Sequence, residues 1–475
     1  AAPVAFRDEG AKEKEPESVE SAEQPLTRQQ RRQREREEKR RGKEEAEPAP
    51  AIPGPGPIAG GRKLILVLCF LSGFGVLALE VLWTRLFSQV LENSVYTFAA
   101  ILVVVLVCLA LGAFLSSRLA RMKTSPLVVL ALLLLAGAGA VAATPFFFLR
   151  LTNDMEIISS TGNWSSYILL IFRSVVLTVG PSALLLGTVF PYLMKVEERH
   201  LKSPGLSLGR LATFNTIGAI LGALLCGFLL LDWLGMWRSM QVIAMIYLVA
   251  VLVLPLGPNV GSVAVKVAGF VLLLVTAVAI NPRAMPVMST DPLGVQERVI
   301  ETWEGKGCTV AVTESRLGLA IKINSHYSLG STGAYQQEEF QADLPLMAYP
   351  ESGDVFFLGV GTGITAGRAL DPLHSRVKKV VACELVPEVV TAAKKYMTNV
   401  GGFDATRGLF HDRRAKVLVE DGRHYLMATD EKFDIINADL FVPFRSGAGS
   451  LYTREHFENA KERLTPEGVF VQWLP

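Results

Sequence analysis

The chain contains 475 residues, half of which are hydrophobic, and carries a formal net charge of +2 at pH 7. That hydrophobic share is high for a soluble enzyme and favours a protein with membrane-spanning helices. The near-neutral charge gives no reason to expect nucleic acid as a partner. The five cysteines and six histidines lack metal-ligand spacing, so the sequence predicts neither a metal site nor a disulfide framework.

Residues 1–61 form a charged tail with few aromatic or branched apolar residues. Its centre, 28–45, mixes basic residues with glutamate, and 48–61 is rich in proline and glycine. Such a segment cannot bury a core, so we expect it to be disordered. Because glutamates dilute the positive field of the arginines, a solvated topology anchor is favoured over a segment that binds lipid or nucleic acid.

A multi-span transmembrane domain is predicted at residues 62–282, which contain seven apolar runs. Each run has about 20 residues, the length needed to cross ~30 Å of hydrocarbon. The runs are 63–83, 95–116, 126–149, 167–194, 208–232, 237–256 and 261–281.

The basic residues around these runs predict the orientation of the chain. The tail and the second and fourth loops are rich in arginine and lysine, whereas the alternate loops carry few basic residues. Positive residues collect on the cytoplasmic side, so we expect a cytoplasmic N-terminus. Seven crossings would place the residues after Asn281 on the opposite side, and one miscounted or re-entrant run would reverse that. The side on which the C-terminal domain lies therefore stays open.

Charged residues inside the apolar runs are candidates for ion pairs or for a functional site. A charge in hydrocarbon is costly, so such residues usually pair or line a cavity. Glu80 and Arg173 form our candidate pair, whereas Arg85 is equally well explained by snorkelling to the interface. Three glycines of the fifth run predict close packing against another helix: Gly218, Gly222 and Gly227.

A small antiparallel β cap is predicted at residues 295–345. Strand-favouring residues occupy 297–303, 308–314 and 319–325, with glycine-containing turns between them. The polar stretch 324–328 and the acidic stretch 336–339 follow. We expect these polar residues to form one wall of a substrate pocket.

A nucleotide-binding α/β domain is predicted from residue 346 to the end. An apolar strand at 355–358 enters a G-x-G-x-G turn, in which glycines let the backbone approach a ligand. Carboxylates then follow successive strands, where they can accept hydrogen bonds from ribose hydroxyls and an adenine amino group. These candidates are Gly359, Gly361 and Gly363 of the turn, then Glu384, Asp421 with Gly422, and Asp439.

The spacing favours a sulfonium nucleoside of the S-adenosylmethionine type over a dinucleotide. A dinucleotide fingerprint would place a third glycine where Ile364 stands. Glu384 follows the turn at a distance suited to a ribose, and Asp421 adds an acid that NAD binding does not require.

From about Ile321 onward the sequence resembles the polyamine aminopropyltransferases, the spermidine and spermine synthase family, and the whole chain is similar to its membrane-fused bacterial branch. The matching pieces are Leu344-Pro345-Leu346, the glycine turn, Glu384, Asp421-Gly422, Asp439 after its strand, and residues 468–472. The resemblance implies a doubly wound, Rossmann-like domain of the class I methyltransferase type behind the β cap, in a bacterial inner (plasma) membrane. It also implies that Glu384 holds the ribose and Asp421 the adenine of decarboxylated S-adenosylmethionine, with no metal, and that Asp439 accepts the proton of the attacking amine.

The amine half of the family pattern is not matched. Thr362 stands where the family has an aspartate in the glycine turn, and Val442 stands where a second aspartate follows the proton acceptor. Those family residues hold ammonium groups, so putrescine is disfavoured as the amine substrate. Glu338, Glu339 and Asp343 are candidate replacements for the missing carboxylates. The candidate substrate-binding residues are Tyr335, Gln337, Glu338, Glu339 and Gln472.

Three functions stay open at this stage. The first is an integral-membrane aminopropyltransferase-like enzyme, and the second is a membrane-tethered methyltransferase-like enzyme. The third is a transporter or sensor whose soluble domain only binds a nucleoside or polyamine. Family members continue beyond the strand at which this chain ends, so we expect the domain at 346–475 to be truncated. Contact with membrane lipid is expected, and a homo-oligomer is left open.

Overall fold

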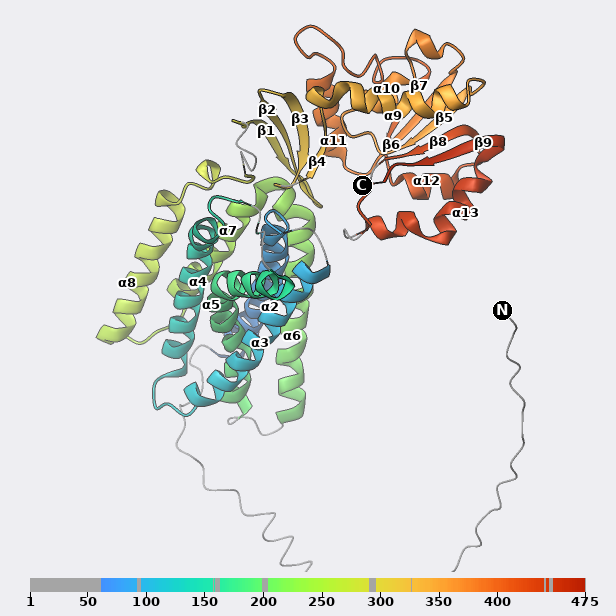
Figure 1. Ribbon diagram of the computed structural model, residues 1–475. Helices are drawn as coiled ribbons and strands as arrows, with labels where there is room; N and C mark the ends of the chain where they lie inside the picture. The colour runs from blue at the N-terminus through green and yellow to red at the C-terminus, as the bar shows by residue number, and fades with distance from the viewer. Residues whose placement is uncertain are drawn as a thin grey trace, which may run out of the picture. The chain divides into compact units, whose positions relative to one another are not determined.

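The computed structural model describes residues 61–91, 95–156, 158, 163–198, 204–289, 296–325, 327–439, 441–443 and 447–474. The tail predicted to be disordered lies outside the described residues. In chain order the described part contains a group of apolar helices, a four-stranded antiparallel sheet and a five-stranded parallel sheet (Figure 1).

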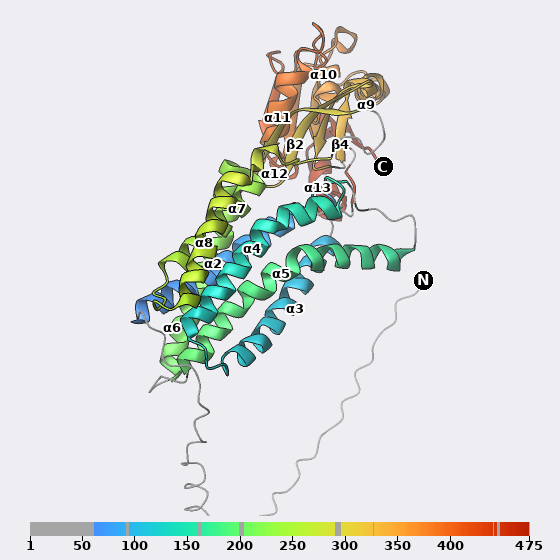
Figure 2. The same ribbon diagram turned by 90° about the vertical axis from the view of Figure 1, so that its left-hand side faces the viewer.

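The apolar helices pack against one another in a single bundle (Figures 1 and 2). Among the described residues, six helices are long and apolar enough to cross a membrane. The elements are α2 (Gly61–Phe87), α3 (Val95–Leu119), α4 (Pro126–Leu151), α5 (Trp164–Glu198), α6 (Pro204–Leu225), the π-helical η1 (Cys226–Leu230), α7 (Leu231–Val253), α8 (Val260–Leu274) and the π-helical η2 (Val275–Ala279).

The number six differs from the seven predicted runs because two of them, 208–232 and 237–256, belong to one 49-residue helical stretch, Gly205–Val253. This stretch is broken at Gly235, whose φ of 74° and ψ of 179° are not helical. Its second half begins beside the β cap, where the Met236 amide donates to Glu304 at 2.7 Å. Farther on, the Tyr247 hydroxyl donates to the Leu71 carbonyl oxygen, near the start of α2.

The first half of the stretch, α6, runs parallel to α2 at close range. A Cβ added at Gly218 would lie 2.1 Å from the Phe70 carbonyl oxygen, and one at Gly222 would lie 2.1 Å from that of Phe74. The predicted close packing is therefore confirmed at these two glycines. At Gly227 the nearest atom, in Val81, would be 3.9 Å away, which is ordinary contact. Since α6 runs parallel to α2 and α7 antiparallel to it, the chain reverses direction at Gly235.

The predicted ion pair between Glu80 and Arg173 is wrong. Both residues are described, and no ion pair or hydrogen bond joins their side chains in this part of the chain. Arg173 lies on an exposed face of α5, whereas Glu80 is partly buried on α2. The sequence places both residues in apolar runs but does not say which helix faces meet.

The β cap is an antiparallel sheet with the strand order β1-β2-β3-β4. Its strands are β1 (Arg298–Glu304), β2 (Thr309–Ser315), β3 (Gly318–Ile323) and β4 (Tyr327–Ser331). The first three correspond to predicted strands, and the fourth arises from the polar stretch that was expected to line a pocket. The end of α2 contacts this sheet, because Arg85 donates to Thr309 Oγ1 at 3.0 Å and Gln89 donates to Asn324 Oδ1 at 3.0 Å.

The C-terminal sheet has the order β7-β6-β5-β8-β9 with every neighbouring pair parallel. Residues alternate along β5, so Val355 and Phe357 pack in one apolar layer while Phe356 and Leu358 pack in the layer on the other face. The predicted doubly wound sheet is therefore present. The strands are β5 (Asp354–Leu358), β6 (Lys379–Glu384), β7 (Ala415–Val419), β8 (Phe433–Ala438) and β9 (Leu464–Gln472), and the main helices are α9 (Tyr335–Ala348), α10 (Ile364–Arg368), α11 (Pro387–Ala392), α12 (Gly422–Ala428) and α13 (Arg454–Glu462).

The strand order reverses between β5 and β8. Strands β6 and β7 extend the sheet on one side of β5, and strands β8 and β9 extend it on the other. In sheets of this kind the crevice outside the carboxyl ends of the strands, at the reversal point, is where ligands bind. The sequence candidates follow β5, β6, β7 and β8 directly, so the fold brings them to this edge.

Candidate active site

A cavity of about 350 Å³ lies at the carboxyl ends of the parallel strands. It is lined by six residues that the sequence singled out, together with side chains of the β cap. The six are Gly359, Gly361, Glu384, Asp421, Gly422 and Asp439. Gly363 and the predicted substrate-binding residues are not among those that line the cavity.

The glycine turn needs glycine for two separate reasons. Gly359 has a φ of +104°, and a Cβ there would lie 3.1 Å from the Cβ of Asp439 and 3.4 Å from its Oδ2. Gly361 has a φ of +54°, and its Cβ would lie 3.3 Å from the Leu329 carbonyl oxygen of the cap. The turn thus adopts left-handed conformations that side chains resist, and it leaves room for Asp439 and the cap on either side. Gly363 belongs to the same turn but does not line the cavity. It adopts a left-handed conformation directly before α10.

Glu384 ties the ends of β5 and β6 together. Its Oε2 accepts hydrogen bonds from the amides of Val360 at 3.1 Å and Gly361 at 3.3 Å, and its Oε1 accepts one from Val386 at 3.0 Å. Burial raises the pKa of this carboxyl, the three backbone hydrogen bonds oppose that rise, and the charge of Asp439 adds to it. Since Oε2 already accepts two hydrogen bonds, it is Oε1 that retains a lone pair for a further donor.

Asp421 caps helix α12. Its Oδ1 accepts hydrogen bonds from the amides of Arg423 at 2.8 Å and His424 at 3.4 Å, which fixes the carboxylate at the mouth of the cavity. The following Gly422 allows α12 to begin against the sheet, since a Cβ there would lie 3.0 Å from Leu358 Cγ.

Asp439 is held through its backbone beside the glycine turn. Its amide donates to the Leu358 carbonyl oxygen at 3.1 Å, and its own carbonyl oxygen accepts a hydrogen bond from Gln472 Nε2 at 2.9 Å. Gln472 therefore contacts the main chain of Asp439 from the last strand rather than lining the cavity.

Glu338, a fourth acid of this region, lies behind the glycine turn. Its side chain is buried, with the residue only 9% exposed, and it accepts hydrogen bonds from the Ser331 amide at 2.7 Å and from the Thr362 hydroxyl. Burial raises its pKa to about 7, against the lowering effect of those two hydrogen bonds, and the nearby Asp439 raises it further. Thr362 stands where the family has an aspartate, and its hydroxyl contacts the carboxylate of Glu338 on α9.

The other predicted substrate-binding residues on α9 lie apart from the cavity. Glu339 is ion-paired with Arg407 at 2.5 Å and with Arg368 at 3.4 Å. Gln337 is exposed, and the ring of Tyr335 packs edge-on against Phe403 with centroids 5.6 Å apart. Asp343, a candidate replacement acid, likewise pairs with Arg368 at 2.7 Å and contacts His374. Of the three candidate replacement carboxylates, Glu338 is the one in contact with the turn.

The β cap and the segment after β8 supply the remaining walls of the cavity. Asn324 and Tyr327 line it, as the polar stretch of the sequence predicted. Phe441 and Leu451 also line it, although neither is among the residues predicted from the sequence. These apolar residues follow Asp439 without a regular pattern, so the sequence carries no signal that separates them from core residues.

The acids around the glycine turn favour a positively charged ligand. The charge of Asp439 raises the pKa of both Glu384 and Glu338, so the three carboxyl groups are coupled across the turn. A cationic group in the cavity would be attracted by Glu384 and Asp439, which line it. Among the residues that the structure describes, no cluster of three or more His, Cys, Asp or Glu residues is arranged to hold a metal ion.

This region of the chain is similar to known proteins. The spermine/spermidine synthase domain model matches residues 335–473. The chain is 30% identical over 178 residues to a polyamine aminopropyltransferase of Thermococcus onnurineus (strain NA1), covering 37% of this chain and 60% of that relative. It is 36% identical over 132 residues to the enzyme of the same name from Pyrobaculum calidifontis, covering 27% of this chain and 43% of the relative.

Among solved structures, the chain is similar to a spermidine synthase in complex with the transition-state analogue AdoDATO. The identity is 26% and the TM-score 0.33, with 36% of this chain and 57% of the other covered. The chain thus spans roughly half the length of the proteins it matches. Residues 335–473 of the chain thus match a spermine/spermidine synthase domain, and the C-terminal part of the chain is similar to polyamine aminopropyltransferases.

Proposed function

We propose that the protein is an integral-membrane aminopropyltransferase, which transfers an aminopropyl group from decarboxylated S-adenosylmethionine to an amine and releases 5′-methylthioadenosine. The observation that carries the proposal is one cavity in which the glycine turn, two strand-end acids and Asp439 meet. Six long apolar helices in the described chain support its membrane location.

The nucleoside half of the substrate fits the residues that line the cavity. Glu384 would accept a ribose hydroxyl with the remaining lone pair of Oε1, while its backbone hydrogen bonds keep the carboxylate in place. Asp421 would accept the adenine amino group with Oδ2, since both helix amides donate to Oδ1. The glycine turn leaves space for the sulfonium next to Asp439, because no side chain projects from Gly359.

Asp439 would act as the proton acceptor. The amine nitrogen attacks the methylene carbon next to the sulfonium, the new C–N bond forms as the C–S bond breaks, and the sulfur keeps the electron pair. The nitrogen must lose a proton during this step, and a carboxylate at the reacting centre can take it. Because the thioether leaves as a neutral molecule, proximity and charge placement supply most of the remaining catalysis.

The amine acceptor is proposed to be other than putrescine. Val442 lines the cavity where a second carboxylate would otherwise hold a distal ammonium group. Burying that charge without a partner would be strongly unfavourable. We assign the role of the missing turn aspartate to Glu338, which reaches the turn through Thr362.

The catalytic assignment is tested with Asp439→Asn in the full-length protein. The substitution preserves the shape of the side chain and removes its basicity, so turnover should be lost while methylthioadenosine binding stays nearly unchanged. Asp430→Asn, an exposed acid outside the cavity, is the matched control and should keep full activity. Full activity of Asp439→Asn would remove Asp439 from the mechanism, and efficient turnover of putrescine by the wild type would overturn the acceptor assignment alone.

Calorimetry separates this function from its alternatives. An aminopropyltransferase should bind decarboxylated S-adenosylmethionine more tightly than ordinary S-adenosylmethionine, since a cluster of acids repels the extra carboxylate. A methyltransferase-like enzyme would prefer the carboxylated form. A sensor or transporter would bind the nucleoside without converting it.

A further inference from the structure

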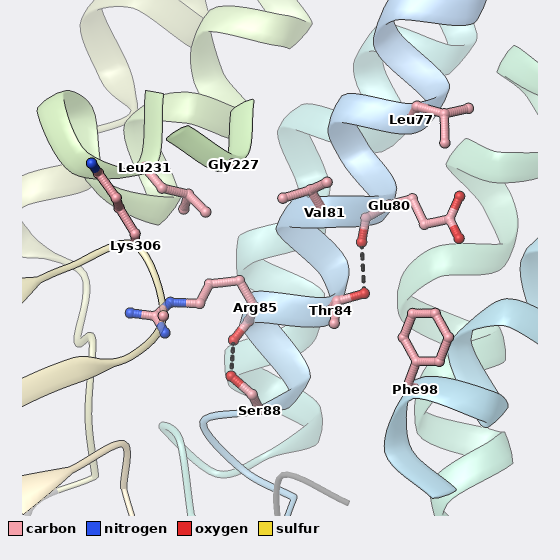
Figure 3. A pocket seen from close by; sticks show the side chains of 11 residues that line it. Leu77, Glu80, Val81, Thr84, Arg85, Ser88, Phe98, Gly227, Leu231 and Lys306 are labelled. Carbon is pink, nitrogen blue, oxygen red and sulfur yellow. Dashed lines mark hydrogen bonds between the residues drawn. The ribbon is translucent and has the colours of Figure 1, made fainter. Parts of the chain in front are cut away.

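A second pocket of about 380 Å³ lies along the last turns of α2, outside the synthase-like cavity (Figure 3). The residues of α2 that line it repeat at helical spacing, which places them on one face of the helix. They are Leu77, Glu80, Val81, Thr84 and Arg85, and Ser88 lines the pocket just beyond the end of the helix. Other walls come from Phe98 of α3, from Gly227 and Leu231, and from the turn between β1 and β2.

Glu80 is the acid of this pocket and lacks a counter-ion. It is only partly exposed, and its carboxylate makes no hydrogen bond or ion pair within the described chain. Its backbone carbonyl oxygen accepts the Thr84 hydroxyl at 2.9 Å, so that hydroxyl does not neutralise the carboxylate. A carboxylate in a low-dielectric setting is costly unless a cation accompanies it, and such residues often mark a binding site.

The nearby arginine is engaged elsewhere. Arg85 points away from Glu80 in Figure 3, toward the β cap, where it donates to Thr309 Oγ1 at 3.0 Å and to the Gly305 carbonyl oxygen at 3.3 Å. Lys306 also lies on that side of the pocket, and Glu80 and the ring of Phe98 lie on the other. The pocket therefore has a negative end with an aromatic face and a positive end.

The donor set favours an organic cation over a metal ion. Calcium and magnesium require six or more oxygen ligands. The pocket offers one carboxylate and two hydroxyls, and those of Thr84 and Ser88 both donate to helix carbonyl oxygens. A primary ammonium needs one carboxylate and gains from an aromatic face, and its hydrocarbon chain would contact Leu77, Val81 and Leu231.

We propose that this pocket binds a primary ammonium group on a flexible hydrocarbon chain, with Glu80 as its counter-charge. The ligand carries one positive charge, because Arg85 and Lys306 would repel a second ammonium at the far end. Two sources supply this chemistry: a free amine, or the ammonium head group of an aminophospholipid. The site is separate from the transferase cavity and does not rest on the proposed function.

The first experiment measures binding of n-hexylamine to the full-length protein in detergent by calorimetry. Glu80→Gln should weaken binding tenfold or more, because a charge-assisted hydrogen bond is lost. Glu80→Asp, which keeps the carboxylate, should retain part of the affinity, and Glu156→Gln, an exposed glutamate outside the pocket, should bind like wild type. Unchanged binding by Glu80→Gln, or equal loss in Glu80→Asp and Glu80→Gln, overturns the proposal.

Two further arms test the single charge and the source of the ligand. Wild type should bind n-hexylamine several-fold more tightly than 1,6-diaminohexane. Lys306→Gln should reduce this difference in affinity. A preference of the wild type for the diamine overturns the assignment of a monocation. In nanodiscs, replacing part of the phosphatidylcholine by phosphatidylethanolamine should weaken n-hexylamine binding if the lipid head group is the occupant. Unchanged affinity in both lipid mixtures assigns the pocket to a free amine.

Discussion

At the scale of single residues, Glu384 has two tasks that a substitution can separate. It accepts backbone hydrogen bonds from Val360, Gly361 and Val386, and it lines the cavity. Glu384→Gln keeps the size of the side chain but loses the charge. Since a hydrogen bond to a charged group contributes ~1.5–3 kcal/mol, methylthioadenosine binding should weaken roughly tenfold or more. Calorimetry of the folded variant checks this, with the exposed neighbour Glu420→Gln as a control expected to bind normally.

Unchanged affinity in Glu384→Gln would contradict the ribose assignment. A loss of affinity that is accompanied by a large fall in melting temperature would instead point to the glycine turn, because the same carboxylate holds that turn. The two tasks are therefore distinguished by measuring binding and thermal unfolding on one sample.

Glu338 predicts a pH dependence of stability. Its pKa is raised from 4.5 to about 7, mainly by burial, so the folded protein holds this proton to higher pH than the unfolded chain does. The free energy of unfolding should therefore fall as the pH rises from about 4.5 to 7, by up to about 3 kcal/mol from this group. Glu338→Gln, which cannot ionise, should flatten this part of the profile. Thermal unfolding across this pH range tests it, and the exposed Glu467→Gln should keep the wild-type slope.

At the scale of elements, the packing of α6 on α2 depends on glycine. Gly222→Ala would place a Cβ 2.1 Å from the Phe74 carbonyl oxygen and should force the helices apart. Gly209→Ala on the same helix meets no atom within 4 Å, so it should be neutral or stabilise the helix by up to about 1 kcal/mol. Melting temperatures in one detergent compare the pair, and equal values for both variants would contradict the close packing.

The elements also show what the sequence could predict. Glu384, Asp421 and Asp439 follow apolar strands, and parallel strands bring such positions to one sheet edge whatever the details of packing. Phe441 and Leu451 reach the same cavity through a segment without periodicity, so no pattern marks them.

The predicted pairing of Glu80 with Arg173 was wrong for a related reason. Hydrophobic runs identify helices but do not specify which helix faces meet. The sequence separates the runs 208–232 and 237–256, and the structure shows a sharp reversal at Gly235 between them, within one helical stretch.

At the scale of the whole molecule, the course of α2 constrains the topology. This helix has 27 residues, about 40 Å at 1.5 Å per residue, enough for one crossing of the bilayer. Its C-terminal end contacts the β cap through Arg85, and Gln89 just beyond it does the same, whereas Gly61 lies at the other end. If α2 spans the membrane, the residues that precede it and the β cap lie on opposite faces.

Cysteine labelling in intact cells tests this arrangement, with Ser18→Cys as the reporter of the tail and Glu351→Cys as the reporter of the synthase-like domain. Glu351 is exposed, whereas the neighbouring Ser352 is only 2% exposed and would label poorly. The five native cysteines are buried, so the background should be low. A membrane-impermeant maleimide should label one reporter and not the other, and permeabilised cells should label both.

The arginine distribution predicts that Ser18→Cys is the protected reporter, since positive residues collect on the cytoplasmic side. The synthase-like domain would then face away from the cytosol, and its nucleoside would have to be delivered across the membrane. Labelling of the tail alone would reverse the orientation and place the cavity in the cytosol, where S-adenosylmethionine derivatives are made. Labelling of both reporters, or of neither, in intact cells would contradict the single crossing of α2, and with it the odd number of crossings between the tail and the β cap.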